Sequence, residues 1–339
     1  MGYNKVMAKP LNKIIYLTAL AVLFGVVLFV LLSFLIEPKT LEMPPKESPE
    51  KESPTSTLLF TGDIMLDRGV EDYINREGKG DYKFPFLKIA DYLQKADILV
   101  GNLEGPISDK GVKAGSIYSF RMDPKAIGGL TYAGFDILSL SNNHMLDYTK
   151  EALTNTLSRL EEAKIDHTGG GLNQDEAYSP VIKELNGTKI AFLSYTNLGS
   201  PNWAAGTTTA GIAWLTEEKL EQGIESAKEK ADIVIVSFHI GEEYKAEPDT
   251  AQKHFSQLAI DYGADAVISH HPHVVQKQEI YKGKHIFYSL GNFVFDQGFS
   301  KETMEGQIVK ISIKEGEIQE VTPIKIKMNE FFQPEIAEE

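Results

Sequence analysis

Acidic, amide and imidazole side chains follow five predicted strands of this 339-residue chain, at the points where the strands end. In chain order they are Asp63; Asn102 and Glu104; Asn143 and His144; His239; and His271 with His273. Such groups supply the oxygen and nitrogen donors that bind Mn, Fe or Zn. In an open α/β sheet, ligands bind outside the carboxyl ends of the strands. The pattern therefore predicts one site for one or two divalent metal ions.

Each of these features also has a purely structural explanation. A Gly-Asp pair after a strand, here Gly62-Asp63, is commonly a turn, and a single histidine at a strand end is commonly a structural residue. His271-Pro272-His273 is more specific, because the fixed proline backbone directs two imidazoles from one turn. Together, the five strand ends favour a metal site over the alternative in which the histidines are inert.

The composition limits the chemistry and the partners. The chain has no cysteine, which excludes disulfides, thiolate zinc sites and cysteine nucleophiles. Its formal net charge is −14, and residues 1–13 contain three lysines and no acid, so the rest of the chain carries −17. A surface this acidic repels phosphate backbones, and we therefore expect no nucleic-acid partner.

Short runs of β-branched residues alternate with amphipathic segments after residue 57. The predicted strands are 58–61, 98–101, 137–140, 190–194, 233–238 and 266–269, and the predicted helices are 84–95, 124–133, 149–163, 216–230 and 249–262. This alternation indicates an α/β fold with helices on the faces of a sheet. Asn186-Gly187 predicts a hairpin. The runs 278–281, 285–290, 306–313 and 318–326 predict a β-rich C-terminal section.

The N-terminal part predicts a membrane anchor. Residues 14–36 are uncharged and mostly apolar, which is long enough to span a bilayer. A cleaved signal peptide is the alternative, but its apolar region is usually about 7–15 residues, and no A-x-A-like site follows Ile36. The lysines before the span predict a cytoplasmic tail over 1–13. A flexible Pro/Glu-rich linker over 37–57 and an extracytoplasmic domain over 58–330 would then follow.

Six motifs resemble those of the CapA/PgsA family of poly-γ-glutamate capsule biosynthesis proteins, over nearly all of residues 58–325. They are GDIMLDR (62–68), GNLEGP (101–106), SNNHMLDY (141–148), HIGEEY (239–244), HHPHVVQ (270–276) and YSLGNFVFDQ (288–297). The order of donor residues is also similar, at a greater distance, to that of the calcineurin-like metallophosphatases. The resemblance implies a layered, metallophosphatase-like α/β sandwich with a β-rich C-terminal section, preceded by one transmembrane helix.

The resemblance also implies roles for individual residues. The implied metal ligands are Asp63, Glu104 as the bridging carboxylate, Asn143, His239, His271 and His273, while His144 would donate a proton to a leaving group. Met65 departs from the metallophosphatase pattern, which has a histidine two residues after the first aspartate. One metal position therefore loses a nitrogen ligand. This implies one tight and one weak metal, or a site without full two-metal chemistry.

Four further polar residues are candidates for substrate binding or for support of the ligands. Arg68 could hold an anionic group bidentately, with a surface ion pair as the alternative. Asn102 would support Glu104, and Asn292 would face the cleft from the β-rich section. Glu243 would orient a ligating histidine or is an acid exposed to solvent.

Two classes of function follow from the resemblance. The first is a membrane-anchored component of poly-γ-glutamate synthesis or export, working with membrane-embedded polyglutamate synthetase components. The second is an extracytoplasmic metal-dependent hydrolase of a phosphoester or of the γ-glutamyl amide. In both, the ligand would be an anionic polymer or a small anionic substrate. Met65 favours the first class, and the otherwise complete set of ligands favours the second.

Overall fold

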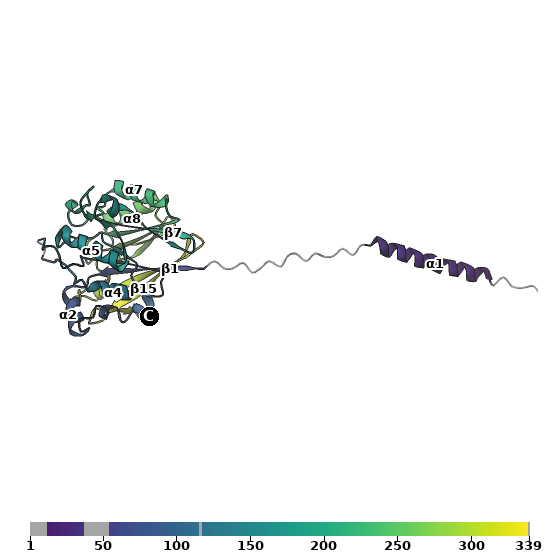
Figure 1. Ribbon diagram of the computed structural model, residues 1–339, viewed down its shortest axis with the longest axis horizontal. Helices are drawn as coiled ribbons and strands as arrows, with labels where there is room; N and C mark the ends of the chain where they lie inside the picture. The colour runs from purple at the N-terminus through teal and green to yellow at the C-terminus, as the bar shows by residue number, and fades with distance from the viewer. Residues whose placement is uncertain (1–11, 37–53, 115–116, 338–339) are drawn as a thin grey trace, which may run out of the picture. The chain divides into compact units, whose positions relative to one another are not determined.

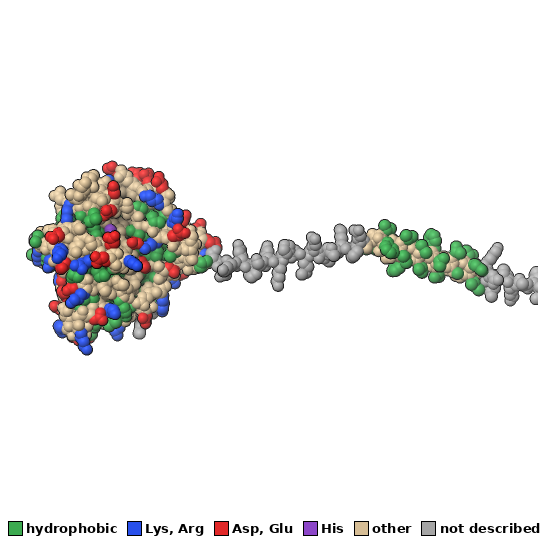
Figure 2. Space-filling view, viewed as in Figure 1, with side chains coloured by type: hydrophobic (Ala, Val, Ile, Leu, Met, Phe, Trp, Pro, Cys, Tyr) green, Lys and Arg blue, Asp and Glu red, His purple; other side chains and the backbone are tan. Residues whose placement is uncertain are grey.

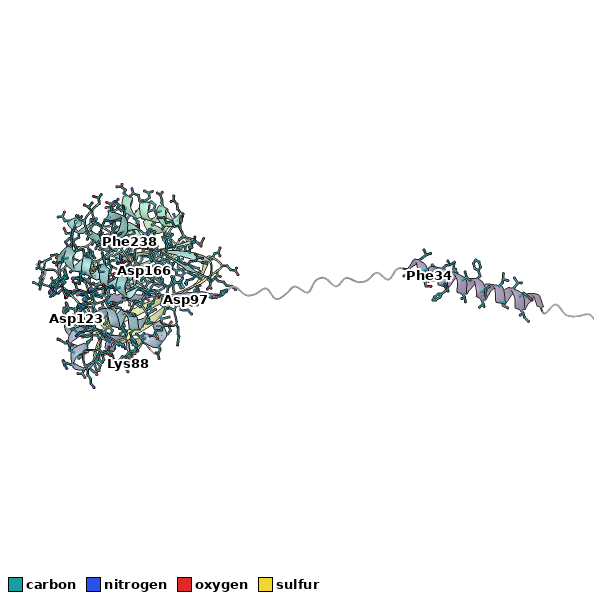
Figure 3. The ribbon with its side chains drawn as sticks, viewed as in Figure 1. Phe34, Lys88, Asp97, Asp123, Asp166 and Phe238 are labelled. Atoms are coloured by element: carbon teal, nitrogen blue, oxygen red, sulfur yellow. The ribbon has the colours of Figure 1, made fainter. Side chains whose placement is uncertain are left out.

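The computed structural model describes residues 12–36, 54–114 and 117–337. The chain divides into two units, Met1–Glu52 and Ser53–Glu339. The first contains helix α1 (Asn12–Leu35), which carries Phe34 near its end (Figures 1 and 3). Its segment Ile15–Leu35 has a mean hydropathy of 2.8 and none of it is buried, so by length and composition it can cross a membrane. Nearly all of the predicted tail (1–13) and most of the predicted linker (37–57) lie outside the described residues.

Two β-sheets form the centre of the second unit. The eight-stranded sheet has the order β16-β15-β14-β1-β2-β3-β4, with β13 also paired to β1, and the six-stranded sheet has the order β11-β12-β10-β9-β7-β6. The first sheet comprises β1 (Ser56–Ile64), β2 (Ile98–Leu103), β3 (Ile137–Ser139), β4 (Asp166–Thr168), β13 (Asn292–Val294), β14 (Glu305–Lys314), β15 (Glu317–Met328) and β16 (Pro334–Ile336). The second comprises β6 (Val181–Leu185), β7 (Thr188–Thr196), β9 (Ile233–His239), β10 (Ala266–His270), β11 (Gln278–Tyr281) and β12 (Lys284–Phe287). A small third sheet pairs β5 (Gly170–Gly171) with β8 (Gly211–Ile212).

Helices cover the outer face of each sheet. Those on the first are α2 (Arg68–Arg76), α3 (Ala90–Leu93), α4 (Ala126–Ala133) and α5 (Thr149–Ala163), and those on the second are α7 (Glu217–Lys228) and α8 (Thr250–Tyr262). Figure 1 shows α7 and α8 on the opposite side of the strands from α2 and α4. A third apolar cluster lies between the sheets, where Phe60 of β1 contacts Phe192 of β7 with ring centroids 6.3 Å apart. The arrangement confirms the predicted layered α/β sandwich.

The central strands are parallel in both sheets and are apolar on both faces. β1 pairs in parallel with β2, and β9 pairs in parallel with β7 and β10. Parallel strands buried on both faces read as continuous apolar runs, which is why the six core strands are visible in the sequence. Helix α8 begins with a capping box between Asp249 and Gln252 and ends at Gly263, whose φ of 111° suits only glycine well.

One predicted helix is wrong, whereas the predicted hairpin is confirmed, and both outcomes have clear physical causes. The helix predicted over 84–95 is wrong: Phe84–Phe86 is a 3-10 turn, and α3 begins only at Ala90. Ile89 separates them with a φ of −128°, outside the helical range. The predicted hairpin at Asn186-Gly187 joins β6 to β7 with φ values of 51° and 82°, as a tight two-residue turn requires.

The β-rich C-terminal section is present, but it is divided between the two sheets. β11 and β12 extend the six-stranded sheet, whereas β13 to β16 belong to the eight-stranded one. The chain enters the globular unit at the start of β1, where the Thr57 amide donates to Asp97 Oδ2 at 2.7 Å (Figure 3). Asp63 lies near the other end of the same strand. The predicted ligands are therefore at the end of the sandwich opposite the point of entry.

Candidate metal centre

The predicted ligands lie together because parallel strands of both sheets end at the same edge. β1 places Asp63 there, β2 leads to Glu104, and β9 ends at His239. Gly62 allows β1 to approach the segment before β13, since a methyl group at this residue would lie 2.0 Å from the Gly291 carbonyl oxygen. The Asp63 amide then donates to that same carbonyl at 3.1 Å, which fixes the aspartate.

The deepest group of ligand atoms belongs to Asp63, Glu104 and His239, which lie within 4.8 Å of one another and are fully buried. His239 Nε2 lies 2.8 Å from Asn143 Oδ1 and 3.2 Å from His271 Nδ1. Ligand atoms about 2.1 Å from one ion lie at separations of about 3–4 Å. The described side chains therefore present donors at the spacing that a bound ion requires.

The imidazole of His273 lies close to the carboxylates of both Asp63 and Glu104. Its Nδ1 lies 3.3 Å from Asp63 Oδ2, and its Nε2 lies 3.6 Å from Glu104 Oε1. Asn292 Oδ1 accepts a hydrogen bond from Nδ1 at 3.0 Å, while the amide nitrogen of Asn292 donates to the Thr303 carbonyl. Because this second bond fixes the orientation of the amide, Nδ1 carries the hydrogen and Nε2 is left for a metal.

Glu104 provides the test of whether the residues fit a metal. The residue is 0% exposed, and neither carboxylate oxygen has a hydrogen-bond partner among the described residues. Buried polar atoms without partners are rare and costly in folded proteins. Burial raises the pKa of Glu104 well above its ordinary value. Burial would also raise the pKa of Asp63, but the hydrogen bond and charge of His273 hold it below its ordinary value. A divalent cation satisfies both oxygens of Glu104, so the donor set fits a metal.

The histidines of the cluster divide into two protonation states. Burial, reinforced by neighbouring histidines, lowers the pKa of His239 well below its ordinary value and that of His271 to about 3. Burial opposes the charged form of His273 too, yet the carboxylates of Glu104 and Asp63 raise its pKa to about 9. His239 and His271 are therefore neutral at pH 7, as metal ligands must be, whereas His273 carries a proton that a metal would replace.

The turn that follows β10 holds its histidines in an uncommon backbone conformation. His271 has a φ of 97° and His273 a φ of 58°. Each such non-glycine residue costs on the order of 1–3 kcal/mol, and residues of this kind gather at functional sites. The His271 amide donates to Asp63 Oδ2 at 3.3 Å, which links the turn to β1. The strained turn thus aims both imidazoles at the carboxylates of the first sheet.

His144 stands beside the ligands with a partner that the sequence analysis missed. Its Nδ1 donates to Asp147 Oδ2 at 2.7 Å, and its Nε2 lies 3.7 Å from Glu104 Oε1. Asp147 also accepts the Phe120 amide at 2.8 Å, and the Phe120 ring lies 4.0 Å from the imidazole. The signal was present as an aspartate three residues after His144. Asp147 therefore orients the ring, which leaves Nε2 able to take or give a proton.

The four supporting residues occupy different surroundings. Asn102 donates to Asp63 Oδ1 at 2.8 Å and to His239 Nδ1 at 3.2 Å, so it holds two ligands rather than Glu104. Asn292 holds His273, and Glu243 lies beside His271 and His273. Arg68 forms a bidentate pair with Asp296, at 3.0 and 2.6 Å. The roles of these residues as supports or substrate contacts stay predictions.

A cleft of about 630 Å³ leads to the centre. Its lining residues are Arg68, Tyr118, Phe120, Asn143, His144, Glu243, Tyr244, His273, Asp296, Gln297 and Phe299. A larger hollow of about 890 Å³ lies between α5 and α6 (Gln174–Tyr178), and none of the predicted ligands lines it. The cleft therefore combines donors, one arginine and several aromatic rings.

Met65 and His270 are two further buried residues close in the chain to the predicted ligands. Met65 is 0% exposed and belongs to the apolar cluster under the helices of the first sheet, where its sulfur accepts the Asp67 amide at 3.1 Å. β1 therefore supplies Asp63 alone to the centre. His270, which the sequence analysis did not select, is buried with Nδ1 3.5 Å from Asp63 Oδ1. Its position immediately before the His-x-His sequence was the available signal.

Solved structures with a similar arrangement share little sequence with this chain. A hypothetical protein from Thermus thermophilus aligns with a TM-score of 0.51 and 17% identity, over 80% of this chain and 99% of that chain. The calcineurin-like phosphoesterase YfkN from Bacillus subtilis aligns with a TM-score of 0.47 and 17% identity, over 80% and 90% of the two chains. The similarity to the Thermus thermophilus protein shows a shared fold and nothing about function.

Relatives with higher identity are capsule proteins. The capsule biosynthesis protein CapA of Bacillus anthracis is 34% identical over 281 residues, 80% of this chain and 67% of that protein. The PGA biosynthesis protein CapA of Bacillus subtilis (strain 168) is 32% identical over 296 residues, 83% of this chain and 76% of that protein. The family described as "Bacterial capsule synthesis protein PGA_cap" matches residues 57–297. This chain belongs to that family of bacterial capsule synthesis proteins.

Proposed function

We propose that this protein is a membrane-anchored component of poly-γ-glutamate synthesis or export, with a divalent metal centre in its extracytoplasmic domain (58–330). The observation that carries the proposal is the family match over residues 57–297, which includes every predicted metal ligand. The buried Glu104, with two unpartnered oxygens, supports the metal centre. The ion would be Mn, Fe or Zn, because the donors are imidazole nitrogens with carboxylate and amide oxygens.

The proposed topology places the N-terminal tail (1–13) in the cytoplasm and the linker (37–57) outside. Three lysines before the apolar helix support this orientation. The natural partners of such a domain are membrane-embedded polyglutamate synthetase components, with which it would share the growing anionic polymer.

An acidic domain needs local positive charge to bind a polyanion. On the visible face of the globular unit, acidic and basic side chains are interspersed without a broad basic surface (Figure 2). A bound divalent ion supplies Lewis acidity and positive charge at the base of the cleft. Arg68 would add a further contact at the cleft wall, although Asp296 already pairs with it. We infer that carboxylates of the polymer bind at the metal centre rather than across the surface.

The test is genetic and uses the protein in its own host. Deletion of the gene should lower cell-associated γ-linked glutamate polymer, measured as glutamate after polymer purification and acid hydrolysis. Wild-type protein should restore it, as should the control His254→Ala, an exposed histidine paired with Glu217. The double variant His271→Ala/His273→Ala should not. Unchanged polymer after deletion would refute the capsule role, and full restoration by the double variant would refute the need for a metal.

A second candidate function is hydrolysis of a phosphoester or of the γ-glutamyl amide. The His144–Asp147 pair beside Glu104 favours it, because an oriented imidazole at a metal centre is suited to proton transfer. The full chain, loaded in turn with Mn, Fe and Zn, would be assayed on p-nitrophenyl phosphate and on γ-linked oligoglutamate. Metal-dependent turnover that His144→Asn removes at unchanged metal content would support hydrolysis. Fully loaded protein without turnover on either substrate would contradict it.

A further inference from the structure

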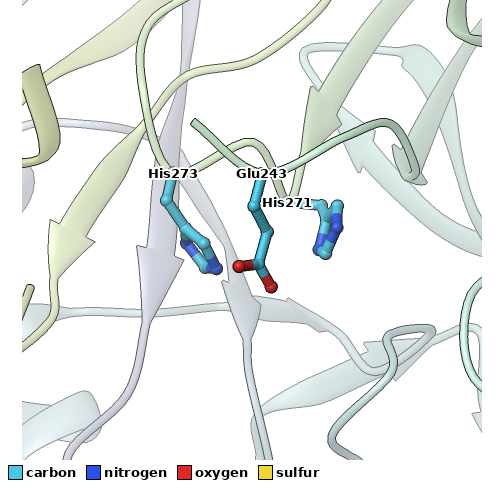
Figure 4. A group of neighbouring side chains, drawn as sticks. All are labelled: Glu243, His271 and His273. Atoms are coloured by element: carbon cyan, nitrogen blue, oxygen red, sulfur yellow. The ribbon is translucent and has the colours of Figure 1, made fainter. Parts of the chain in front are cut away.

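The loop after β9 places an exposed carboxylate beside the two histidines of the β10 turn. Ligand atoms of Glu243, His271 and His273 lie within 4.8 Å of one another. Figure 4 shows the Glu243 side chain between the two imidazoles. The three residues form a second group of donors, separate from the buried group of Asp63, Glu104 and His239. Unlike every member of that group, Glu243 is exposed and lines the cleft.

The loop that carries Glu243 is held in a defined position. Gly241 has a φ of 115°, and a methyl group there would lie 2.5 Å from the buried side chain of Gln252. Tyr244 has a φ of 61°, and its amide donates to the Pro272 carbonyl at 2.8 Å. These constraints on both sides of Glu243 tie the loop to the turn that bears the histidines. Its carboxylate is therefore directed to the same place by the backbone, and not by side-chain flexibility alone.

The positive charge beside Glu243 is that of the protonated His273, which also faces the carboxylates of Asp63 and Glu104. The arginine that lines the cleft, Arg68, is committed to Asp296 through two hydrogen bonds. The other carboxylates nearby, Asp63 and Glu104, add negative charge. Three carboxylates around one imidazolium leave an excess of negative charge, which a divalent cation among them would offset.

The number of protein donors at the centre also favours a role for Glu243 as a ligand. β1 contributes Asp63 only, because Met65 is packed in the apolar core. An ion held at His273 would then have one protein donor fewer than the metallophosphatase pattern supplies. Atoms that bind one ion at about 2.1 Å lie within about 4.2 Å of each other, so donors within 4.8 Å need only a small movement to share an ion. The flexible side chain of Glu243 can make that movement.

We propose that Glu243 is a direct metal ligand, which binds an ion together with His271 or His273 and closes the cleft side of the centre. The inference rests on the proposed metal centre and extends it to a residue for which the sequence predicts either a role in orienting a histidine or an acid exposed to solvent. Because Glu243 also lines the cleft, its carboxylate occupies the coordination position that faces an incoming anionic group. The carboxylate is thus the ligand that an anion of the substrate would replace.

The experiment compares two neighbouring glutamates in the full chain purified in detergent. Metal is removed with a chelator, and Co²⁺ is added while its visible absorption, which depends on the ligands, is recorded. Glu243→Ala is the test variant, and Glu242→Ala is the matched control, since Glu242 is exposed and outside both groups of donors. Tryptophan fluorescence confirms that each variant is folded. Acetate is then added to each sample to replace a missing carboxylate.

We expect Glu243→Ala to weaken Co²⁺ binding by at least about tenfold and to change the spectrum, whereas Glu242→Ala matches the wild type. Acetate should restore the wild-type spectrum of Glu243→Ala, which a residue that merely positions a histidine would not allow. Equal affinity and an equal spectrum in Glu243→Ala and wild type would overturn the inference and leave the proposed function intact. A wild-type chain that binds no Co²⁺, Mn²⁺ or Zn²⁺ would overturn the metal centre itself.

Discussion

Replacing Glu104 by glutamine removes a buried ionisable carboxyl group while it keeps the shape of the side chain. Both oxygens of Glu104 are buried without a hydrogen-bond partner among the described residues, although His273 Nε2 and His144 Nε2 lie 3.6 and 3.7 Å from Oε1. Burial raises the pKa of the carboxyl. An unsatisfied buried polar group costs about 1–3 kcal/mol, and more when it is charged. The amide has no assured partner either, so the lower end of this range applies. We expect the metal-free Glu104→Gln variant to be more stable than the metal-free wild type by about 1 kcal/mol.

Bound metal should reverse the order of stability of the wild type and the Glu104→Gln variant. A ligand at 100 times its dissociation constant stabilises the folded state by about 2.7 kcal/mol. The wild type should gain that amount with Mn²⁺, whereas Glu104→Gln should gain little because it lacks the central carboxylate. At about 2–4 °C of Tm for each kcal/mol, the wild type should rise by about 5–10 °C. The variant is thus the more stable protein without metal and the less stable one with it.

Thermal unfolding of the full chain in detergent, followed by tryptophan fluorescence, measures both effects. The chain has two tryptophans, Trp203 and Trp214, and both lie in the globular unit, so helix α1 does not contribute to the signal. Glu184→Gln, at an exposed glutamate of β6, is the matched control and should behave as the wild type. A metal-free Glu104→Gln variant that is less stable than wild type by 1 kcal/mol or more would refute the reasoning.

Three further predictions follow from the same geometry. Mn²⁺ binding at pH 7 should release protons, because the His273 pKa is about 9 and its proton must leave before the metal binds. The apparent affinity should therefore rise with pH and level off above about 9. Calorimetry in two buffers of different ionisation enthalpy measures the proton release. Asp147→Asn should leave metal content unchanged, since Asp147 supports His144 alone among the proposed site residues, and should lower any turnover about 10²–10⁴-fold in the p-nitrophenyl phosphate assay. Gly62→Ala should destabilise the globular unit by about 1–3 kcal/mol in urea unfolding, because the new methyl group meets the Gly291 carbonyl. The first prediction would be contradicted if Mn²⁺ bound without releasing protons, and the second if Asp147→Asn lost its metal. The third would be contradicted if Gly62→Ala were as stable as the wild type.

The sequence was informative where a structural pattern and a chemical pattern coincide. Buried parallel strands appear as apolar runs, and five of the six predicted core runs end within a few residues of a donor side chain, so both the α/β fold and the edge that carries the donors could be predicted. The prediction of a helix over 84–95 failed. Its apolar residues have helical spacing, but the backbone at Ile89 is not helical. Periodicity reports which side chains reach the core, and both a helix and two short turns can satisfy it.

Contacts between residues far apart in the chain were beyond sequence reasoning. Arg68 was expected either to hold an anion or to form a surface ion pair. The structure shows an ion pair with Asp296, which lies 228 residues away, and neither residue signals the other in the sequence. Asn102 was assigned to Glu104, its neighbour in the chain, whereas it holds Asp63 and His239. The sequence identifies residue types at a strand end. The pairing among them depends on how two sheets are packed against each other.

The charges of the site make metal binding a condition for either proposed function. In the metal-free protein, Asp63, Glu104 and Glu243 surround the base of the cleft, and the charge of Arg68 is offset by Asp296. The protonated His273 compensates only part of this negative charge. An anionic polymer or phosphoester would be repelled from such a site, and the charge of −17 beyond the N-terminal tail adds to the repulsion. Bound divalent ions would offset this local negative charge and leave the charge of the remaining surface unchanged. A substrate assay on metal-free protein therefore tests neither function, and the metal content has to be known first.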